Sequence, residues 1–380
     1  MPGLTEDQAA FAESVRAFGR KHLADGALER AHEPHYSWDT AKLLADQGLL
    51  GLTIPESDGG QGASLMDAVI AIQELALICP KSADIVQAGN FGAIRTFAEF
   101  ATAEQKRRYL AGLLEGRELI ALGMSEPEAG SAVTELKTTA EEDGDDYVIN
   151  GTKIWSTHSS DATLYLVYVR FAPGTNGIGS VLIDRETPGF EVGEPSAYMS
   201  GEVWSQLYFD NCRIPKGNVL LGAGGFKKQM SGFNVERIGN SARSIAIGRL
   251  AFNLAREHVS SREQFGHTLN EFQGLQWKFA ESAVALDGAQ LLLERAVANA
   301  VDGLPSAYDT AVAKLAANEA GFLAANNAMQ SMGAMGYSTE SLVEYCMRRT
   351  RGWMIAGGST EILKNRIAES VFGRRFSQRG

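Results

Sequence analysis

The chain has 380 residues, with 35 Lys and Arg against 46 Asp and Glu, so its formal net charge is −11. Hydrophobic residues make up 44% and charged residues 21%, a composition typical of a globular protein and unlike that of a disordered or collagen-like chain. The acidic balance argues against a nucleic-acid-binding protein, and no apolar run approaches the ~20 residues of a membrane helix. The N-terminal segment is acidic and amphipathic, unlike a signal or transit peptide.

The three cysteines, Cys79, Cys212 and Cys346, are far apart and lack the Cys-x-x-Cys spacing of metal or redox sites. We therefore expect reduced thiols and a cytoplasmic protein.

Residues 1–118 are predicted to form an N-terminal α-helical domain. Phe11, Val15 and Phe18 illustrate the helical spacing of apolar residues in this segment. Thr102 predicts a capped helix start before AEQKRRYLAGLL, and Pro55 to Gly62 form a Gly-rich loop.

Residues 119–225 are predicted to form a middle β domain. Short β-rich runs such as LYLVYVRF and GSVLIDR are separated by Gly, Pro and Asn. Within YVINGTKIW, Asn150-Gly151 is a strong signal for a two-residue hairpin turn. No helix pattern intervenes, so we expect a small antiparallel barrel or sandwich and not a parallel βαβ sheet.

Residues 226–380 are predicted to form a C-terminal helical bundle. The segments expected to be helical are 226–261, 271–302, 306–332, 342–355 and 360–372. Four or five antiparallel helices of this length favour a four-helix bundle, so the predicted fold class is α+β.

Most generic chemical motifs are absent. Gly222 to Gly225 do not complete a dinucleotide-binding loop, and no Walker A, HExxH, EF-hand or nucleophile-elbow pattern occurs. His32 to His35 have no fourth ligand nearby, so we interpret them as a polar loop and expect no metal. The Arg-rich run Arg348 to Arg351 is consistent with an anion site, a solvated helix face or a subunit contact.

Several local strings, in order along almost the whole chain, together resemble the acyl-CoA dehydrogenase flavoprotein family. The strings are Ile54-Pro55-Glu56 with Gly59-Gly60, Met124 to Ser131, Asn150 to Trp155, Ser261 to Gly266, Phe272-Gln273, Gln330 to Tyr337, and Gly357 to Ile362. The resemblance implies an oxidoreductase that contains FAD and oxidises the CH–CH group of an acyl-CoA thioester.

The resemblance implies that the middle domain carries the flavin ring. Met124 and Ser125 are expected against the isoalloxazine, with Trp155 packed on it and Thr157 bonded near its N5. Donors at this edge stabilise the negative charge that develops as the ring accepts a hydride.

The resemblance also assigns cofactor contacts to the C-terminal domain. Arg262 is expected to pair with the FAD pyrophosphate, which suits a fork-shaped and permanently charged guanidinium. The other expected contacts are Gln264, Phe265 and Gln273, to the cofactor of a neighbouring subunit; Gln330 and Gly333, near the pyrophosphate and ribose; and Ser359 and Glu361, near the adenylate.

The family reaction needs a carboxylate that removes the α-proton while a hydride leaves the β-carbon for flavin N5. Many members carry this base directly before the Gly-Ser/Thr string, where this chain has Gly357, which has no side chain. A minority, the isovaleryl- and long-chain-type members, carry it on the first bundle helix before an Arg. The chain has Glu236-Arg237 there, so the expected base is Glu236, although taken alone it reads as an exposed helix carboxylate. Ser131, Arg237 and Gly357 are the expected substrate contacts.

Departures from the family pattern lie on the expected substrate side, at Ala132, Ser156 to Ser159 and Tyr198 to Trp204. They leave the acyl group open, with branched, cyclic and aromatic groups or a carrier-protein thioester as alternatives. A flavin monooxygenase of the same fold is a third possibility, which Glu236 argues against, and a non-catalytic binding protein a fourth. By resemblance, we expect a homotetramer and an electron-transferring flavoprotein as acceptor, with no nucleic-acid or membrane partner.

Overall fold

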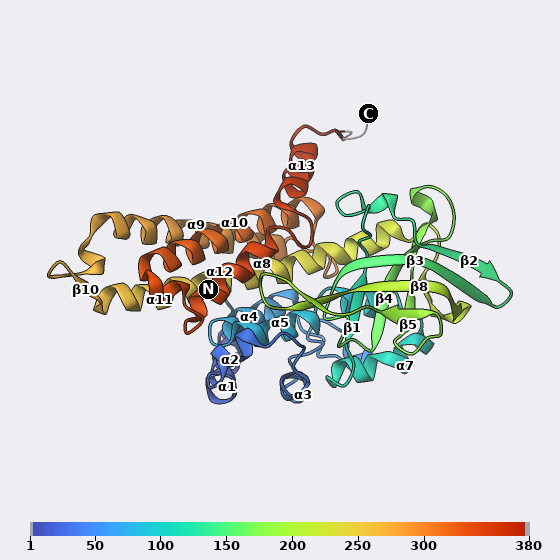
Figure 1. Cartoon of the computed structure of the whole chain (residues 1–380), viewed down its shortest axis with the longest axis horizontal. Helices are drawn as coiled ribbons and strands as arrows, with labels where there is room; N and C mark the ends of the chain where they lie inside the picture. Colours follow the sequence, from blue (N-terminus) through green and yellow to red (C-terminus); the bar gives the residue numbers. More distant parts are fainter. Residues whose placement is uncertain (1–2, 377–380) are drawn as a thin grey trace. The chain divides into compact units, whose positions relative to one another are not determined.

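A computed structural model describes residues 3–376 of the chain. They form two compact units: the sheet unit, residues 33–63 and 88–233, and the bundle unit, residues 3–32, 64–87 and 234–376. The chain passes from the sheet unit into the bundle unit within one long helix, α8 (Phe226–Ser261) (Figure 1). The N-terminal helical segment contributes residues to both units.

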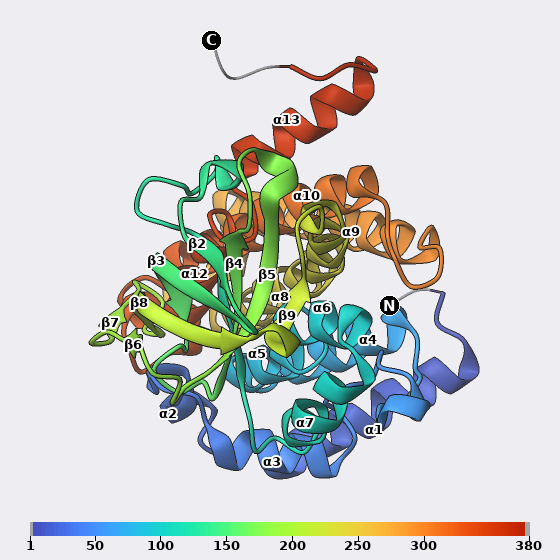
Figure 2. The same cartoon turned by 90° about the vertical axis from the view of Figure 1, so that its right-hand side faces the viewer.

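The sheet unit is built on one nine-stranded sheet with the main order β6-β8-β3-β2-β4-β5-β9; β1 also pairs with β4 and β7 with β8. Figure 2 shows β8, β3, β2, β4 and β5 side by side. The strands are β1 (Ile120–Gly123), β2 (Thr139–Asp143), β3 (Asp146–Thr157), β4 (Leu164–Arg170), β5 (Ile178–Asp184), β6 (Phe190–Val192), β7 (Ser196–Ala197), β8 (Val203–Pro215) and β9 (Val219–Leu221).

Strand β4 is buried on both faces, which explains its continuous run of large apolar residues. Tyr165 and Val167 belong to one core cluster, while Leu164 and Leu166 belong to another that includes Phe97. This second cluster is covered by α6 (Ala93–Phe100) and α7 (Ala103–Leu114); α3 (Trp38–Asp46) also belongs to this unit. Thr102 caps α7 as predicted, with Gln105 completing a capping box.

The sheet is mostly antiparallel, as predicted, but it is mixed. Strand β1 runs parallel to β4, and Thr139 of β2 forms a parallel pairing with Arg170 of β4. The sequence pattern reveals strands and turns, whereas pairing between distant strands depends on how the chain returns to the sheet.

The predicted hairpin turn at Asn150-Gly151 is wrong. Strand β3 continues through both residues, and its pairing with β8 has a bulge between Ile149 and Gly151. A Cβ on Gly151 would lie 2.5 Å from Thr138 Oγ1, so glycine is needed here for close approach and not for a turn. The turn lies at Gly144, with a φ of +64°, between the paired residues Asp143 and Asp146.

The bundle unit confirms the predicted C-terminal helices. They are α8, α9 (Gln273–Ala298), α10 (Ala307–Met332), α12 (Leu342–Trp353) and α13 (Thr360–Val371), with a short α11 (Ala334–Tyr337). The N-terminal segment adds α1 (Glu6–His22), α2 (Ala27–His32), α4 (Leu65–Ala76) and α5 (Pro80–Ala88). A hairpin, β10 (Glu263–Gln264) with β11 (His267–Thr268), connects α8 to α9.

Helices α8 and α10 pack closely because glycines meet at their crossing. A Cβ added to Gly248 would lie 2.8 Å from the Cα of Gly321, and one added to Gly321 would lie 2.4 Å from the Ser244 carbonyl oxygen. This approach brings the polar residues of α10 against the part of α8 that carries Glu236. Among the described residues, no helix combines the length and apolar character needed to cross a bilayer.

Candidate active site

Glu236 lies on the part of α8 that belongs to the bundle unit. Its neighbours Val235 and Ile238 are fully buried, and Glu236 itself is partly buried. The buried Gln87 of α5 donates its Nε2 to Glu236 Oε1 at 2.6 Å. Among the described residues, Oε2 accepts no hydrogen bond, so one carboxylate oxygen is oriented and the other is available.

Burial raises the pKa of Glu236 to about 7, although Arg243, the Gln87 amide and Lys314 each favour the ionised carboxylate. Desolvation therefore exceeds the three opposing effects together. A carboxylate with this pKa is a much stronger base than an exposed glutamate and remains partly ionised near neutral pH.

Arg243 is the strongest of the three groups that favour the ionised carboxylate, and it is itself paired with another acid. Asp84 of α5 forms ion pairs with Arg243 and, at 3.0 Å, with Arg349 of α12. Both guanidinium groups also lie over the ring of Trp353, at 3.9 and 4.3 Å from its centroid. This buried cluster holds α5, α8 and α12 together behind Glu236.

Gly357 and Gly358 form the turn between α12 and α13, with φ values of +72° and +95°. The Nε of Arg237 donates to the Gly357 carbonyl oxygen at 3.4 Å, and burial is the main reason why the pKa of Arg237 falls to about 10. Arg237 thus contacts the turn that carries Gly357, so two of the predicted substrate residues lie together.

In the sheet unit, the loop after β1 carries Met124 and Ser125 and is fixed by a buried ion pair. Lys153 of β3 donates to Glu126 Oε1 at 2.7 Å and to the Met124 carbonyl oxygen at 3.3 Å. The backbone and hydroxyl of Thr138 also donate to Glu126. The carboxylate therefore sets the backbone path of both predicted flavin residues.

The two charges of this pair respond differently to burial. Burial opposes ionisation of Glu126, but Lys153 and the hydrogen bonds from Thr138 and Lys137 outweigh it and hold its pKa below the usual range. Burial lowers the pKa of Lys153 to about 8, against the opposing attraction of Glu126. Each charge therefore depends on the other.

Trp155 and Thr157 lie where the pairing of β3 with β8 becomes irregular. A register shift falls between Lys153 and Ser156, and Trp155 has a φ of +61°, unusual for a bulky residue. Trp155 is 54% exposed, and the centroid of its ring is 4.2 Å from that of Trp204. Its backbone carbonyl oxygen accepts a hydrogen bond from the Tyr198 hydroxyl at 3.1 Å. Such strain is typical of functional sites.

The predicted cofactor residues of the bundle unit lie at its helix ends. Arg262 directly follows α8, Gln264 and Phe265 lie in the β10–β11 hairpin, and Gln273 begins α9. Phe265 is 93% exposed with a φ of +54°. Figure 1 shows that this hairpin and α11, which follows Gly333, lie toward the same end of the unit.

The remaining predicted residues lie at other turns. Gln330 and Gly333 end α10 and are exposed, and Ser359 caps α13 by accepting from Ile362 N. Glu361 lies in the first turn of α13 and is exposed. In the sheet unit, Ser131 is exposed after a short bridge between Glu126 and Ala129.

Three residues that the sequence analysis gave no role lie against predicted site residues: Gln87 and Lys314 in the bundle unit, and Lys153 in the sheet unit. Lys153 belongs to the string Asn150 to Trp155, which carried the resemblance, so the sequence held a signal for it. Gln87 and Lys314 reach the vicinity of Glu236 from distant helices. No local pattern distinguishes them from other polar residues of a helix.

Other polar features remain structural. His32 lies against the Thr339 carbonyl oxygen and His35 against Asp161, and within residues 3–376 no cluster of His, Cys, Asp or Glu has the arrangement of a metal site. Arg348 of the Arg-rich run pairs with Glu344, and Arg349 with Asp84.

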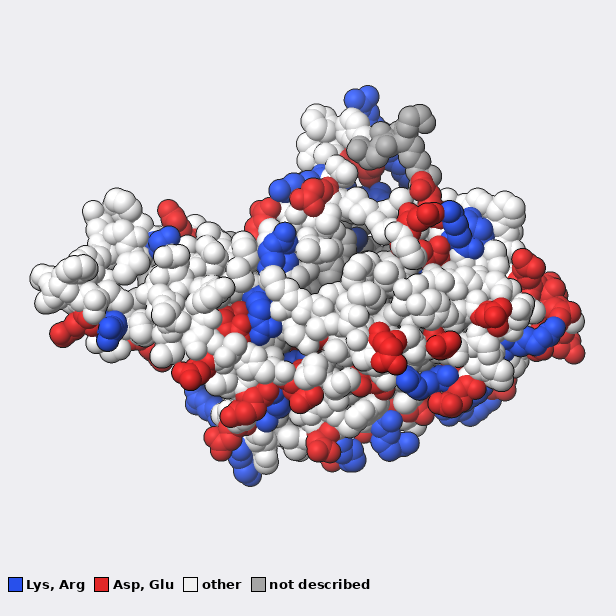
Figure 3. All heavy atoms as spheres, viewed as in Figure 1, with Lys and Arg blue, Asp and Glu red and all other residues white. Residues whose placement is uncertain are grey.

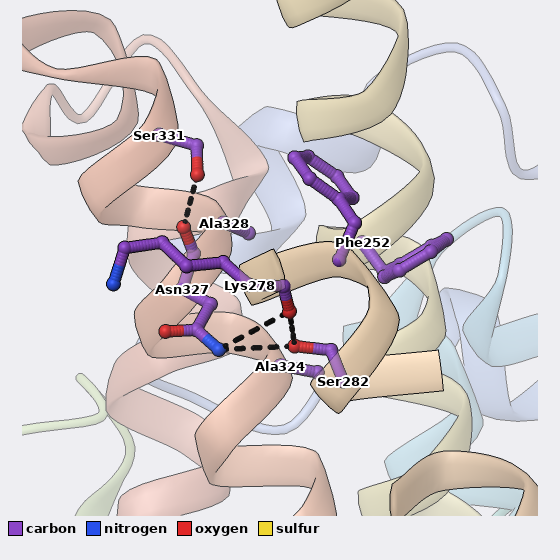
Figure 4. Close-up of a pocket in the computed structure, with 8 residues that line it drawn as sticks. Phe252, Lys278, Ser282, Ala324, Asn327, Ala328 and Ser331 are labelled. Carbon is purple, nitrogen blue, oxygen red and sulfur yellow. Dashed lines mark hydrogen bonds between the residues drawn. The ribbon is translucent and has the colours of Figure 1, made fainter. Parts of the chain in front are cut away.

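A small pocket between α8, α9 and α10 is also separate from the predicted site residues (Figure 4). Asn327 of α10 bonds to α9: its Nδ2 donates to Ser282 Oγ at 3.1 Å and to the Lys278 carbonyl oxygen at 3.4 Å. The residues lining the pocket are Phe252, Lys278, Phe279, Ser282, Ala324, Asn327, Ala328 and Ser331.

Models of the three acyl-CoA dehydrogenase domains match the chain in order. The N-terminal domain matches residues 5–117, the middle domain residues 121–212 and the C-terminal domain residues 223–372. The chain belongs to the acyl-CoA dehydrogenase family. The domain limits that we place after residues 118 and 225 stay a prediction.

Curated relatives span nearly the whole chain. A 3-sulfinopropanoyl-CoA desulfinase of Paraburkholderia xenovorans is 32% identical, with 99% of this chain and 98% of the relative covered. A short-chain-specific acyl-CoA dehydrogenase of Clostridium acetobutylicum is 31% identical, with coverages of 97% and 99%. Relatives of similar identity therefore have different reactions in their names.

Solved structures show the same fold over nearly all of both chains. Butyryl-CoA dehydrogenase from Megasphaera elsdenii superposes with a TM-score of 0.90 at 29% identity, covering 97% of this chain and 99% of that one. A glutaryl-CoA dehydrogenase in complex with glutaryl-CoA gives 0.93 at 28% identity, covering 99% and 98%. The family binds FAD and dehydrogenates acyl-CoA thioesters, so the chain is an FAD-dependent oxidoreductase acting on CH–CH groups.

The buried ion pair beneath Met124 gives a first prediction. Lys153→Met leaves the Glu126 carboxylate buried without its cation, so the free energy of unfolding should fall by about 3–5 kcal/mol. Lys137→Met removes a cation from the exposed pair with Glu128 and should leave the free energy of unfolding nearly unchanged. Urea unfolding of both variants measures the difference, and equal losses would contradict the structural role of Lys153.

Proposed function

We propose that Glu236 removes the α-proton of an acyl-CoA thioester in a dehydrogenation that forms the trans-2-enoyl-CoA. The observation that carries this proposal is a partly buried carboxylate whose pKa is raised to about 7, in a chain where Gly357 has no side chain to act as base. The Gln87 hydrogen bond orients Oε1 and leaves Oε2 for the substrate proton. When bound, FAD supplies the acceptor for the hydride that leaves the β-carbon.

The proposed FAD contacts have the chemistry that the cofactor needs. Arg262 forms no ion pair with any described residue, so its exposed cation is available to a phosphate. In the bundle unit the other proposed contacts are Gln264, Phe265, Gln273, Gln330, Gly333, Ser359 and Glu361; in the sheet unit they are Met124, Ser125, Trp155 and Thr157. Ser131, Arg237 and Gly357 are proposed for the substrate.

The acyl group and the electron acceptor belong to the same proposal. A carrier-protein thioester remains an alternative to acyl-CoA, and an electron-transferring flavoprotein is the proposed acceptor. A flavin monooxygenase has no need of an α-proton base, so Glu236 disfavours it. Cys79, Cys212 and Cys346 are buried free thiols, which supports a cytoplasmic location.

We also propose a homotetramer. Trp277, Val284 and Leu291 follow one another at intervals of seven along α9 and are 59%, 75% and 59% exposed. Figure 3 shows few charged atoms on the visible face of the bundle end that carries β10 and α11. Exposed apolar residues on one helix face mark an association surface.

The activity is tested by adding acyl-CoA thioesters anaerobically and following the bleaching of the flavin. Short-chain, branched and aromatic acyl-CoAs test the substrate class. A parallel assay with 3-sulfinopropanoyl-CoA tests the desulfinase activity for which several relatives are named. Failure of every acyl-CoA to bleach the flavin would contradict the proposed dehydrogenation.

Glu236→Gln retains the shape of the side chain and removes the basic oxygen. It should bind FAD and acyl-CoA normally, while substrate-driven flavin reduction slows by ~10²–10⁴-fold, the usual contribution of a positioned acid–base group. Glu257→Gln, an exposed position on the same helix, is the control and should reduce its flavin at the wild-type rate. A wild-type rate for Glu236→Gln would place the base elsewhere.

The raised pKa of Glu236 predicts a pH dependence. Only the ionised carboxylate accepts the proton, so kcat/KM should rise with pH and level off above a midpoint of about 7. This rise of kcat/KM with pH should be absent from the residual activity of Glu236→Gln. If the same rise persists in that variant, the titrating group is not Glu236.

Arg262→Ala should weaken FAD retention because a charge-assisted contact to phosphate contributes ~1.5–3 kcal/mol. The ratio of flavin absorbance to protein absorbance after gel filtration measures the loss. Arg256→Ala, which removes an exposed cation six residues earlier, in the last turns of α8, should retain its cofactor. Full FAD content in Arg262→Ala would exclude Arg262 from the cofactor site.

Light scattering should give the mass of four copies of the 40.9 kDa chain. Val284→Glu places a charge in the centre of the apolar α9 face and should shift the protein to smaller species, because an unpaired charge is costly to bury. An unchanged mass for this variant would exclude the face from the interface, and a monomeric wild type would contradict the tetramer.

A further inference from the structure

A buried row of polar side chains connects α10 to α8 in the bundle unit. Lys314 Nζ donates to Asn318 Oδ1 at 2.9 Å. Asn318 Nδ2 in turn donates to Asn240 Oδ1 at 3.0 Å and to Ser244 Oγ at 2.8 Å. All of these residues are at most 1% exposed. The row ends at Asn240 Nδ2, which is buried and has no hydrogen-bond acceptor among the described residues.

The lysine at one end sets the direction of every hydrogen bond in this row. An ammonium group donates three hydrogen bonds and accepts none, and Lys314 also donates to the carbonyl oxygens of Trp353 and Gly358. The side of the Asn318 amide that faces Lys314 must therefore be its oxygen. The Asn318 nitrogen then faces Asn240, which must present its own oxygen. The free end of the Asn240 amide is thus an N–H donor.

This free donor faces the space beside Gly357. A Cβ added to Gly357 would lie 3.9 Å from Asn240 Nδ2, which is ordinary van der Waals distance, and 3.2 Å from Lys314 Cε. Gly357 is partly exposed and has a φ of +72°, a conformation that favours glycine. The turn between α12 and α13 therefore leaves this space, where a side chain would otherwise lie, to another group.

Asn240 also lies on the same face of α8 as the proposed base. Glu236 and Asn240 are four positions apart, so their side chains are about one turn apart on one side of the helix, ~6 Å along its axis. Gly357 is itself a proposed substrate contact. An acyl chain that runs along this face from Glu236 would reach the Asn240 amide within a few carbon atoms.

The chemistry of the free donor restricts what that chain carries. A buried N–H group without an acceptor is unfavourable, and folded proteins retain few of them. A purely hydrocarbon chain would cover the Asn240 amide and leave the donor unsatisfied. An oxygen on the chain would instead complete the hydrogen-bonded row that begins at Lys314.

We infer that Asn240 is a specificity-determining residue whose amide donates to an oxygen acceptor, a carbonyl or a carboxylate, on the distal part of a short acyl chain. The inference rests on the proposed dehydrogenation at Glu236 and deepens it by naming the substrate class. That class is short acyl-CoA thioesters with a polar end.

The first test measures binding to the FAD-loaded Glu236→Gln variant by calorimetry. The probes have five-carbon acyl chains: pentanoyl-CoA offers no distal acceptor, 4-oxopentanoyl-CoA offers a ketone, and glutaryl-CoA offers a carboxylate. At least one of the two oxygen-bearing thioesters should bind about tenfold more tightly than pentanoyl-CoA, the discrimination that one hydrogen bond can give. Equal or tighter binding of pentanoyl-CoA would overturn the inference, and this is the result expected if only water satisfies the donor.

The second test changes the amide in the same Glu236→Gln background. Asn240→Leu removes the amide, whereas Asn240→Asp retains an oxygen that can accept from Asn318 and replaces the donor by a second oxygen. In both variants the preference for the oxygen-bearing thioester should fall about tenfold. The preference is a ratio of two Kd values from one preparation, so a general loss of folded protein cancels.

Ser244→Ala is the matched control because it removes the other acceptor of the Asn318 amide without changing Asn240, and it should retain the original preference. An unchanged preference in both Asn240 variants, or an equal change in Ser244→Ala, would overturn the inference. If the Asn240 variants do not retain FAD, the comparison of the three thioesters in Glu236→Gln alone decides. Failure of every acyl-CoA to reduce the wild-type flavin would instead contradict the proposed function, and the binding preference could still be measured.

Discussion

The cost of burying a charge constrains the active-site part of the bundle unit more than any other interaction. Asp84, Arg243 and Arg349 meet that cost with ion pairs and with the ring of Trp353. Glu236 lies beside this cluster but forms no ion pair with any described residue, so burial raises its pKa to about 7. The structure thus separates charges that maintain packing from a charge that is left reactive.

Buried lysines organise loops in both units, and in each case backbone carbonyls are among their partners. Lys153 contacts the Met124 carbonyl oxygen and the Glu126 carboxylate, which fixes the loop after β1. Lys314 contacts the carbonyl oxygens of Trp353 and Gly358, which fixes the turn between α12 and α13. The two lysines differ in the charge of their partners: Lys153 pairs with a carboxylate, whereas the hydrogen-bond acceptors of Lys314 are neutral.

Strained and exposed aromatic residues mark the remaining parts of the proposed site. Trp155 and Phe265 both have positive φ values and large exposed surfaces. A positive φ is strained for a bulky residue, and an exposed side chain contributes little hydrophobic stabilisation to its own folded chain. We propose that contacts with a cofactor or with another copy of the chain account for these conformations.

The sequence by itself determined the helices of the bundle, the change to strands in the middle of the chain and the family. Helical periodicity and capping are local, which is why the start and end of α8 were predicted at residues 226 and 261. The choice of Glu236 also came from the sequence, through Gly357 and the family pattern. Only the tertiary structure decided that Asn150-Gly151 continues a strand, because the pairing of Thr139 with Asn150 places the backbone of Thr138 against Gly151, where a Cβ would not fit. The same holds for Gln87 and Lys314: the pKa of Glu236 depends on groups from α5 and α10, and desolvation exists only once those helices pack together.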